Sequence, residues 1–320
     1  MGAMIPSTVL ADLTGLLSLV RVEGGGLRIG ENVVPGAAGA GVGDDEVCDA
    51  LYVQWYLGGA PAAGAPPDPT EEALLGGRLV GYLRAAHAGT RLFGPGWVVL
   101  TRGEHGECLV GRGEERRVVH HTEYVSVSRP GVPVAPGEQV AVTMRVDTTD
   151  DATRWWATRS PQGEPEGPLG RFYLHPYADS APAVVHELTT RLLASDLRWS
   201  IKASTDPRGY RRPDAIVLYT PREDSQTACA AVTDLTSGLG TDSLQSSAPP
   251  LTMPIASGVG YAEDPGPDIS FGTSRCRALT TGVRAVATEG LTGQDAVRAL
   301  TESLAAAGID PTRPWREPVP

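Results

Sequence analysis

Lysine is the residue that this sequence most clearly lacks. Lys and Arg together number 27 in 320 residues, and Lys202 is the only lysine. A guanidinium group keeps its proton at any accessible pH, whereas an ammonium group can release one. Because arginine serves wherever a plain positive charge is needed, the single lysine is a candidate for a role that requires a neutral amine. A chance surface lysine is the competing interpretation.

Other absences exclude several classes of protein. The net charge of −11 argues against a duplex nucleic acid partner, since phosphate backbones are bound by broad basic surfaces. No run approaches the roughly 20 apolar residues that a membrane-spanning helix needs. The N-terminus has neither the charged start nor the apolar run of a signal peptide. We therefore expect a cytoplasmic protein with no membrane or nucleic acid partner.

The four cysteines are too widely spaced to form a metal-binding motif. Buried free thiols are the expected state, and we predict no metal site. Gly24-Gly25-Gly26 has no following Lys-Ser/Thr, so it is not a phosphate-binding loop. The cysteines are Cys48, Cys108, Cys229 and Cys276.

Hydrophobic periodicity predicts helices, then a run of strands, then mixed elements. This order favours an α+β fold with a largely antiparallel sheet flanked by helices. A helical N-terminal region, residues 1–92, would precede an α+β domain, residues 93–320, although one continuous domain is an alternative. Helices are expected at 7–20, 44–57, 68–87, 181–195, 222–236, 271–288 and 292–307; short strands follow residue 94, with others in 154–160, 170–177, 197–204 and 214–220; 58–69 and 237–268 are expected to be loops.

Positive charge gathers between residues 198 and 222. This segment has six basic and two acidic residues, a net charge of +4, so the rest of the chain sums to −15. A localised cationic patch on an acidic protein indicates a small anion such as a phosphate monoester. The basic residues are Arg198, Lys202, Arg208, Arg211, Arg212 and Arg222.

Alternation along the expected strands places polar side chains on one face. In LRWSIKAS, Arg198, Ser200 and Lys202 share a face, and in GRFYLHPY, so do Arg171, Tyr173 and His175. Two neighbouring strands would present these side chains to one cleft. Each residue also has a purely structural interpretation, as a strand aromatic, a turn residue or a solvated arginine pair, and Trp155 and Trp156 are interpreted as core and edge residues.

β-Elimination of phosphate from phosphoserine suits such a cluster. The reaction needs a base for the α-proton, cations for the phosphate and, in some schemes, an acid for the leaving group. Guanidinium groups near Lys202 would favour its neutral amine, because like charges repel. Lys202 is therefore the candidate base.

The same residues carry a family resemblance. GRFYLHPY, the stretch WSIKASTDPRGYRRPDAIVLY, GVGYAEDP and SFGTSRCRAL together resemble the Hop-A-type effector-like family, over about residues 165–285. That family's fold is similar to the phosphothreonine lyases of bacterial pathogens. In clusters for class V lanthipeptides and thioamitides, such proteins look like the lyase partner of an aminoglycoside-phosphotransferase-like kinase, which phosphorylates a precursor peptide.

The resemblance implies residue roles. Lys202, separated from Thr205-Asp206 by two residues, matches the family's base. Arg171 replaces a phosphate-binding lysine, and Tyr173 falls where the family has a histidine acid. Tyr173, His175 or no strong acid at all could then serve the leaving group. Phosphate contacts are implied for Arg212 and Arg275, and we add Arg211, Tyr219 and Arg222 as candidates from their position in or beside the cationic segment.

The resemblance thus implies a phosphoserine or phosphothreonine lyase that needs no metal or organic cofactor and yields dehydroalanine or dehydrobutyrine. Two alternatives remain from the sequence. One is a non-catalytic protein that binds a phosphopeptide or a kinase. The other is an effector that targets a host, which the actinobacterial-looking composition disfavours.

Overall fold

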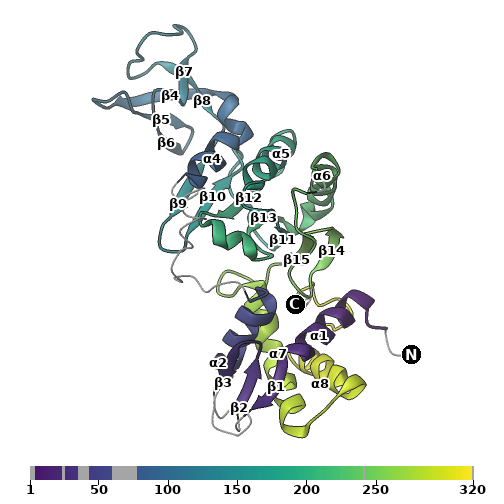
Figure 1. Ribbon diagram of the computed structural model, residues 1–320. Coiled ribbons are helices and arrows are strands. Elements are labelled where there is room, and N and C mark those ends of the chain that lie inside the picture. The colour runs from purple at the N-terminus through teal and green to yellow at the C-terminus, as the bar shows by residue number, and fades with distance from the viewer. Residues whose placement is uncertain (1–3, 24–25, 35–42, 60–77, 241, 319–320) are drawn as a thin grey trace.

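The computed structural model describes residues 4–23, 26–34, 43–59, 78–240 and 242–318. Most of the expected loop at 58–69 and the start of the helix expected from residue 68 lie outside these residues. Three sheets and their helices make up the described fold (Figure 1). None of the described helices has the length and apolar character to cross a membrane.

A seven-stranded sheet forms the centre of the molecule. Its strand order is β14-β15-β11-β13-β12-β10-β9, and every neighbouring pair is antiparallel. This sheet and its flanking helices confirm the predicted α+β class. Its strands are β9 (Asp147–Asp150), β10 (Trp155–Arg159), β11 (Leu169–Leu174), β12 (Ser200–Ser204), β13 (Ile216–Pro221), β14 (Met253–Ala256) and β15 (Val259–Glu263).

One face of this sheet is covered by helices α4, α5 and α6. Alternation along the strands points large apolar side chains such as Trp156, Phe172 and Leu218 into this layer, where all three are fully buried. The expected amphipathic helix at 181–195 is confirmed as α5. The helices are α4 (Leu79–Ala86), α5 (Ala181–Leu193) and α6 (Ser225–Gly238).

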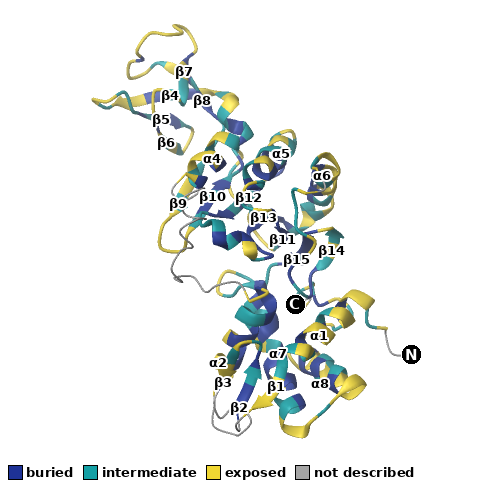
Figure 2. Cartoon of the chain, viewed as in Figure 1, coloured by how far each residue is buried: buried dark blue, intermediate teal, exposed yellow. Residues whose placement is uncertain are grey.

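The opposite face is only partly covered. Tyr173 and Val217 on the middle strands pack in one core with Tyr56 and Phe271. This core joins helices from both ends of the chain, as the dark, buried residues of Figure 2 show. The helices are α1 (Ser7–Leu19), α2 (Asp44–Leu51), a π-helical turn η1 (Tyr52–Tyr56), α7 (Phe271–Glu289) and α8 (Gly293–Ala306).

The first part of the chain also contains strands that the sequence analysis did not predict. They form a three-stranded antiparallel sheet in which Leu27, Ile29 and Val34 are buried. Each strand is only three or four residues long, too short for alternation to stand out beside the glycine run. The strands are β1 (Val20–Glu23), β2 (Gly26–Ile29) and β3 (Asn32–Val34).

A five-stranded antiparallel sheet lies at one end of the molecule (Figure 1). We call residues Phe93–Thr143 the β-domain. Its core contains Trp97, Cys108 and Val140, and its strands follow the β-branched runs expected after residue 94. The strands, in the order β6-β5-β4-β8-β7, are β4 (Phe93–Arg102), β5 (Cys108–Arg112), β6 (Glu115–Val119), β7 (Tyr124–Ser126) and β8 (Gln139–Thr143).

The expectation of a loop at 237–268 was wrong for its second half. Strands β14 and β15 lie there, and β15 pairs with β11 near the middle of the sheet. Glycines made this stretch look like a turn. Gly258, with φ of +71°, does sit in one, but Gly260 lies in β15, where an added Cβ would be 2.2 Å from Thr252 Oγ1.

Candidate active site

Strand register brings three of the predicted side chains onto the partly covered face of the central sheet. Lys202 lies opposite Val217, and the neighbouring row pairs Ser200 with Tyr219 and Tyr219 with Arg171. Because directly opposed residues of antiparallel strands point to the same side, Lys202, Tyr219 and Arg171 project together.

The expected adjacency of the two key strands was wrong. Strand β13 lies between β11 and β12, so Tyr173 and Lys202 are separated by two strand spacings, about 10 Å. Alternation predicts the correct face for Tyr173 and Lys202, but the order of the strands does not follow from alternation. As a result Tyr219 of β13, and not Tyr173, is the tyrosine next to Lys202.

Aromatic rings hold the lysine. Its Nζ lies 4.7 Å from the ring centroid of Trp155 and 5.6 Å from that of Tyr219. Arg212 Cζ lies 5.7 Å from the Trp155 ring, and Arg171 Cζ lies 5.3 Å from the Tyr219 ring. Cations and ring faces attract each other, so the two rings place three positive charges close together. We call these five residues the cation–aromatic cluster.

Acidic partners fix the two arginines. Arg171 Nη2 donates to Asp264 Oδ1 over 2.6 Å, and Arg212 donates through Nε and Nη2 to both oxygens of Asp214 over 2.9 Å each. Lys202, by contrast, makes no side-chain hydrogen bond or ion pair with any of the described residues. It is therefore the cation of the cluster whose charge has no carboxylate partner within the described part of the chain.

A cavity of about 330 Å³ opens beside Lys202. Half-buried Lys202 and Tyr219 form one wall, and Arg159, paired with Glu164 over 2.9 Å, forms another. Lys202 and Tyr219 thus line a space large enough for an amino-acid side chain with its phosphate, whereas Trp155, Arg171 and Arg212 are not among the described residues that line it. The other described residues that line it are Val146, Asp147, Thr148, Ala157, Thr158, Ser200 and Ile201.

Comparison with known proteins places this cluster within a family. The model of the HopA1 effector protein family matches residues 145–316, more than half of the chain and all of the cation–aromatic cluster. The chain belongs to the HopA1 effector protein family. No match was found among the curated proteins.

Two solved structures of Pseudomonas syringae effector proteins are similar to this HopA1 family chain. The effector from pathovar tomato strain DC3000 is 16% identical, with a TM-score of 0.49, over 86% of this chain and 95% of the effector. The effector from pathovar syringae strain 61 is 14% identical, with a TM-score of 0.44, over 86% of this chain and 98% of the effector.

Tyr173 and His175, the two expected acids, are buried away from the cavity. Tyr173 is 3% exposed and packs against Phe271, with its hydroxyl lacking a hydrogen-bond partner in the described structure. Burial raises its pKa, against the opposing effect of Arg171. His175 is also 3% exposed, its Nδ1 lies 2.9 Å from the Ser247 carbonyl oxygen, and burial lowers its pKa. Neither is among the described residues that line the cavity beside Lys202.

Two of the candidate phosphate ligands, Arg222 and Arg275, bind other groups of the protein itself. Arg222 pairs with Glu263 over 2.8 Å, close to Tyr261 on the face covered by α6. Arg275 is fully buried in α7, where its guanidinium binds the end of the chain: Nε donates to the Pro314 carbonyl and Nη2 to Glu317. The cation–aromatic cluster therefore contains Arg171 and Arg212 but not Arg222 or Arg275.

Arg211 ends a short 3-10 helix, η3 (Pro207–Arg211), and its side chain is exposed. Arg212, the next residue, turns inward to Asp214 and Trp155. The tandem arginines thus separate into one surface residue and one cluster residue, which the sequence alone did not distinguish. Among the described residues, no group of three or more His, Cys, Asp or Glu is placed to hold a metal ion.

Trp155 is the cluster residue that sequence reasoning missed. It pairs with Ser204 across β10 and β12, on the same face as Lys202, while Trp156 points into the opposite core. Alternation alone assigns the two tryptophans to opposite faces. Only the register between β10 and β12, however, shows that Trp155 reaches the lysine.

Proposed function

We propose that the chain is a phosphoserine or phosphothreonine lyase. It would eliminate phosphate from a phosphorylated precursor peptide and leave dehydroalanine or dehydrobutyrine, as in lanthipeptide or thioamitide biosynthesis. The observation that carries this proposal is the position of Lys202. The only lysine lies beside a cavity, without a carboxylate partner among the described residues, between two rings that each contact an arginine.

The proposed reaction is a base-induced elimination. The neutral amine of Lys202 takes the Cα proton of the phosphorylated residue and becomes an ammonium group. The electrons of the broken C–H bond form the Cα=Cβ double bond, the Cβ–O bond breaks, and phosphate leaves with the electron pair of that bond. The products are the alkene, inorganic phosphate and a protonated lysine, which returns its proton to solvent.

Cations next to the lysine would stabilise the departing phosphate. Arg171 and Arg212 are held in place by Asp264 and Asp214, so little reorganisation is needed when a dianion arrives. Tyr219 could add a hydroxyl contact from the cavity wall.

The leaving group need not depend on Tyr173 or His175 in this proposal. Both are 3% exposed, whereas Arg171 and Arg212 each contact one of the two rings that hold Lys202. Guanidinium groups can carry the developing charge without donating a full proton. We therefore assign leaving-group stabilisation to Arg171 and Arg212.

The substrate would require an earlier phosphorylation step. A serine or threonine hydroxyl is a poor leaving group, so a kinase must first convert it to a phosphate ester. We propose a kinase of the aminoglycoside-phosphotransferase type as that partner, on the basis of the family resemblance.

Mass spectrometry of a phosphorylated precursor peptide incubated with the full chain tests this function. Elimination removes the elements of phosphoric acid, whereas a phosphatase removes those of metaphosphoric acid and restores the hydroxyl. A thiol added afterwards should attach to the new alkene. Saturable phosphopeptide binding with no mass change, even with kinase and unphosphorylated leader segment present, would contradict the lyase and support a binding protein instead.

A further inference from the structure

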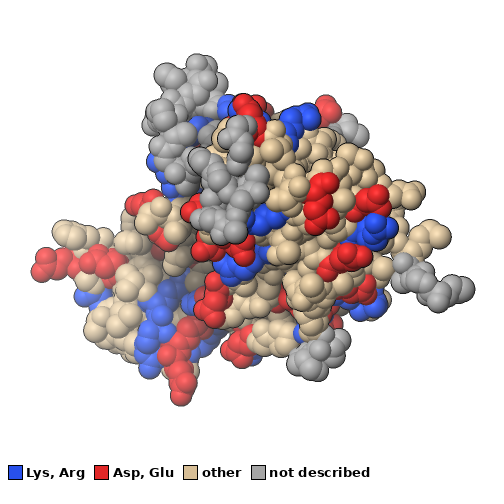
Figure 3. Space-filling model, turned by 90° about the horizontal axis from the view of Figure 1, so that it is seen from below, with Lys and Arg blue, Asp and Glu red and all other residues tan. Residues whose placement is uncertain are grey.

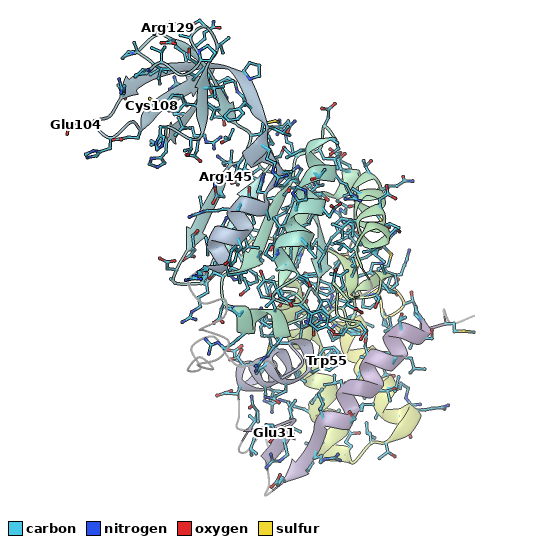
Figure 4. All side chains as sticks on the ribbon, turned by 45° about the horizontal axis from the view of Figure 1, so that its top comes forward. Glu31, Trp55, Glu104, Cys108, Arg129 and Arg145 are labelled. Atoms are coloured by element: carbon cyan, nitrogen blue, oxygen red, sulfur yellow. The ribbon has the colours of Figure 1, made fainter. Side chains whose placement is uncertain are left out.

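A second and larger cavity lies where the β-domain joins the rest of the molecule. Its volume is about 660 Å³, and Arg145, which follows β8, lies at this junction in Figure 4. We call it the junction cavity. The described residues that line it are Arg84, Thr90, Arg117, Val118, His120, Thr122, Glu123, Thr143, Arg145, Val146 and Asp147.

The walls of the junction cavity carry more positive than negative charge. Three guanidinium groups face two carboxylates, on a protein whose net charge is −11. Elsewhere, on the face seen in Figure 3, basic and acidic side chains are intermixed. A local excess of arginine on an acidic protein indicates an anionic ligand.

The two carboxylates are already shared between arginines. Asp147 pairs with Arg84 over 2.7 Å and with Arg145 over 3.0 Å, and it also accepts a hydrogen bond from Trp156 Nε1 over 2.9 Å. Glu123 pairs with Arg145 and lies 4.0 Å from Arg117. Each guanidinium has five N–H donors, so this wall has more donors than its own carboxylates can satisfy.

Burial adds to the need for an anion. The Arg117 side chain is 14% exposed and donates through Nη1 to the Thr143 carbonyl over 2.6 Å. Burial lowers the pKa of Arg117, more than Glu123 raises it. A buried guanidinium whose charge is not fully compensated favours an incoming carboxylate or phosphate.

The junction cavity lies close to the lysine. It shares Val146 and Asp147 with the cavity beside Lys202. Thr148 pairs with Ala157, and Ala157 pairs with Lys202, so this edge is two strand spacings, about 10 Å, from the lysine. Strand β9 is the last strand of the sheet order, so its outer edge is not occupied by a further described strand. Three extended residues span about 10 Å, so a segment of about four to six residues would run from the lysine past this edge and into the junction cavity.

We propose that the junction cavity binds an acidic side chain of the same peptide whose phosphorylated residue reacts at Lys202. This inference rests on the proposed function and adds a specificity rule to it. The acidic residue would lie about four to six positions from the phosphorylated residue. The β-domain precedes the family match at residues 145–316, and in this chain it supplies Arg117 and Glu123 to the cavity.

Peptide binding tests the rule without requiring turnover. Two fluorescein-labelled peptides would each carry one phosphoserine, with either two Asp or two Asn residues centred five positions away. Fluorescence anisotropy with the full chain should give a dissociation constant about tenfold lower for the acidic peptide. The difference should shrink as salt is raised, because exposed charge pairs are screened.

Arg84→Gln and Arg117→Gln should each reduce this preference to about threefold or less. Arg102→Gln is the matched control, because Arg102 lies exposed on β4 of the same β-domain and outside the described lining of the cavity. Circular dichroism would verify folding. Arg84→Gln is the safer variant, because Asp147 keeps Arg145 and Trp156 as partners.

Equal dissociation constants for the two peptides, or a preference that survives both arginine variants, would overturn the proposal. The outcome is separable from that of the lyase assay. If both phosphopeptides bind without elimination, the proposed function fails while the preference still reports on the cavity. If both peptides lose phosphate and bind with equal affinity, the lyase function stands and the acidic subsite fails.

Discussion

His87 should make the stability of the protein depend on pH in the weakly acidic range. This histidine is fully buried at the end of α4, between the β-domain and the central sheet. Its Nδ1 accepts from the Gly89 N–H over 2.9 Å, and its Nε2 lies 3.1 Å from Thr158 Oγ1. Because the Thr158 hydroxyl donates to the Val146 carbonyl, Nε2 must carry the hydrogen. If Nδ1 were protonated, its N–H would face the Gly89 N–H, and neither donor would have an acceptor.

The size of the effect follows from the pKa of His87. Burial is the largest cause that lowers it, from 6.5 to about 4. The unfolded chain then binds more protons than the folded chain between these values, so stability falls as pH drops from 6.5 to 4. The full loss corresponds to about 3 kcal/mol, since a tenfold change in a proton equilibrium is worth about 1.4 kcal/mol.

Urea denaturation at pH 7.5 and pH 4.5 measures this difference. His87→Gln preserves an acceptor and a donor but cannot take up the proton. The wild-type chain should lose about 2–3 kcal/mol more than the variant between the two pH values. If both proteins lose the same amount of stability, His87 does not cause the loss at acidic pH and the tautomer assigned above is wrong.

Three further predictions concern side chains that are buried or partly buried. Tyr173→Phe should keep elimination activity within about threefold, because Tyr173 is buried away from the cavity; a loss of a hundredfold or more would restore it as the acid. Arg275→Lys should lower the free energy of unfolding by about 3 kcal/mol, because it breaks a buried network with Glu317. Phosphopeptide affinity in the folded fraction should not change. Weaker binding at unchanged stability would instead make Arg275 a phosphate ligand. Burial raises the pKa of Asp12 to about 6, against the opposing effect of the hydrogen bond from the Leu251 N–H. Stability is therefore lost as pH rises from 4 to 6, and Asp12→Asn should remove up to about 3 kcal/mol of that loss in urea denaturation. An unchanged pH dependence would show that the carboxyl is not the group responsible.

The sequence predicted which face each residue would take. Alternation in two strands placed Lys202 and Arg171 on polar faces, and both assignments are confirmed by the pairing with Val217 and Tyr219. This works because the side-chain period of a strand is fixed by backbone geometry. That Lys202 is the only lysine is also evident from the sequence alone. The α+β class followed in the same way from the order of helical and strand periods.

Strand order and long-range burial could not be predicted. Nothing within β11 or β12 indicates that β13 separates them, because strand order depends on how the whole sheet packs. Arg275 follows a Ser-aromatic pair as the resemblance requires, yet its guanidinium is occupied by residues about 40 positions later in the chain. Alternation alone predicts a core or edge position for Trp155, because its contact with Lys202 depends on register with a strand 45 residues away.

The substitution Lys202→Arg is the decisive test of whether Lys202 acts as the base. It keeps a positive charge between Trp155 and Tyr219 but removes the only side chain of the cluster able to act as a neutral amine base. With a phosphorylated precursor peptide, we expect the variant to bind within a few-fold of wild type and to form no dehydrated product. Elimination at the wild-type rate by the Lys202→Arg protein would contradict it.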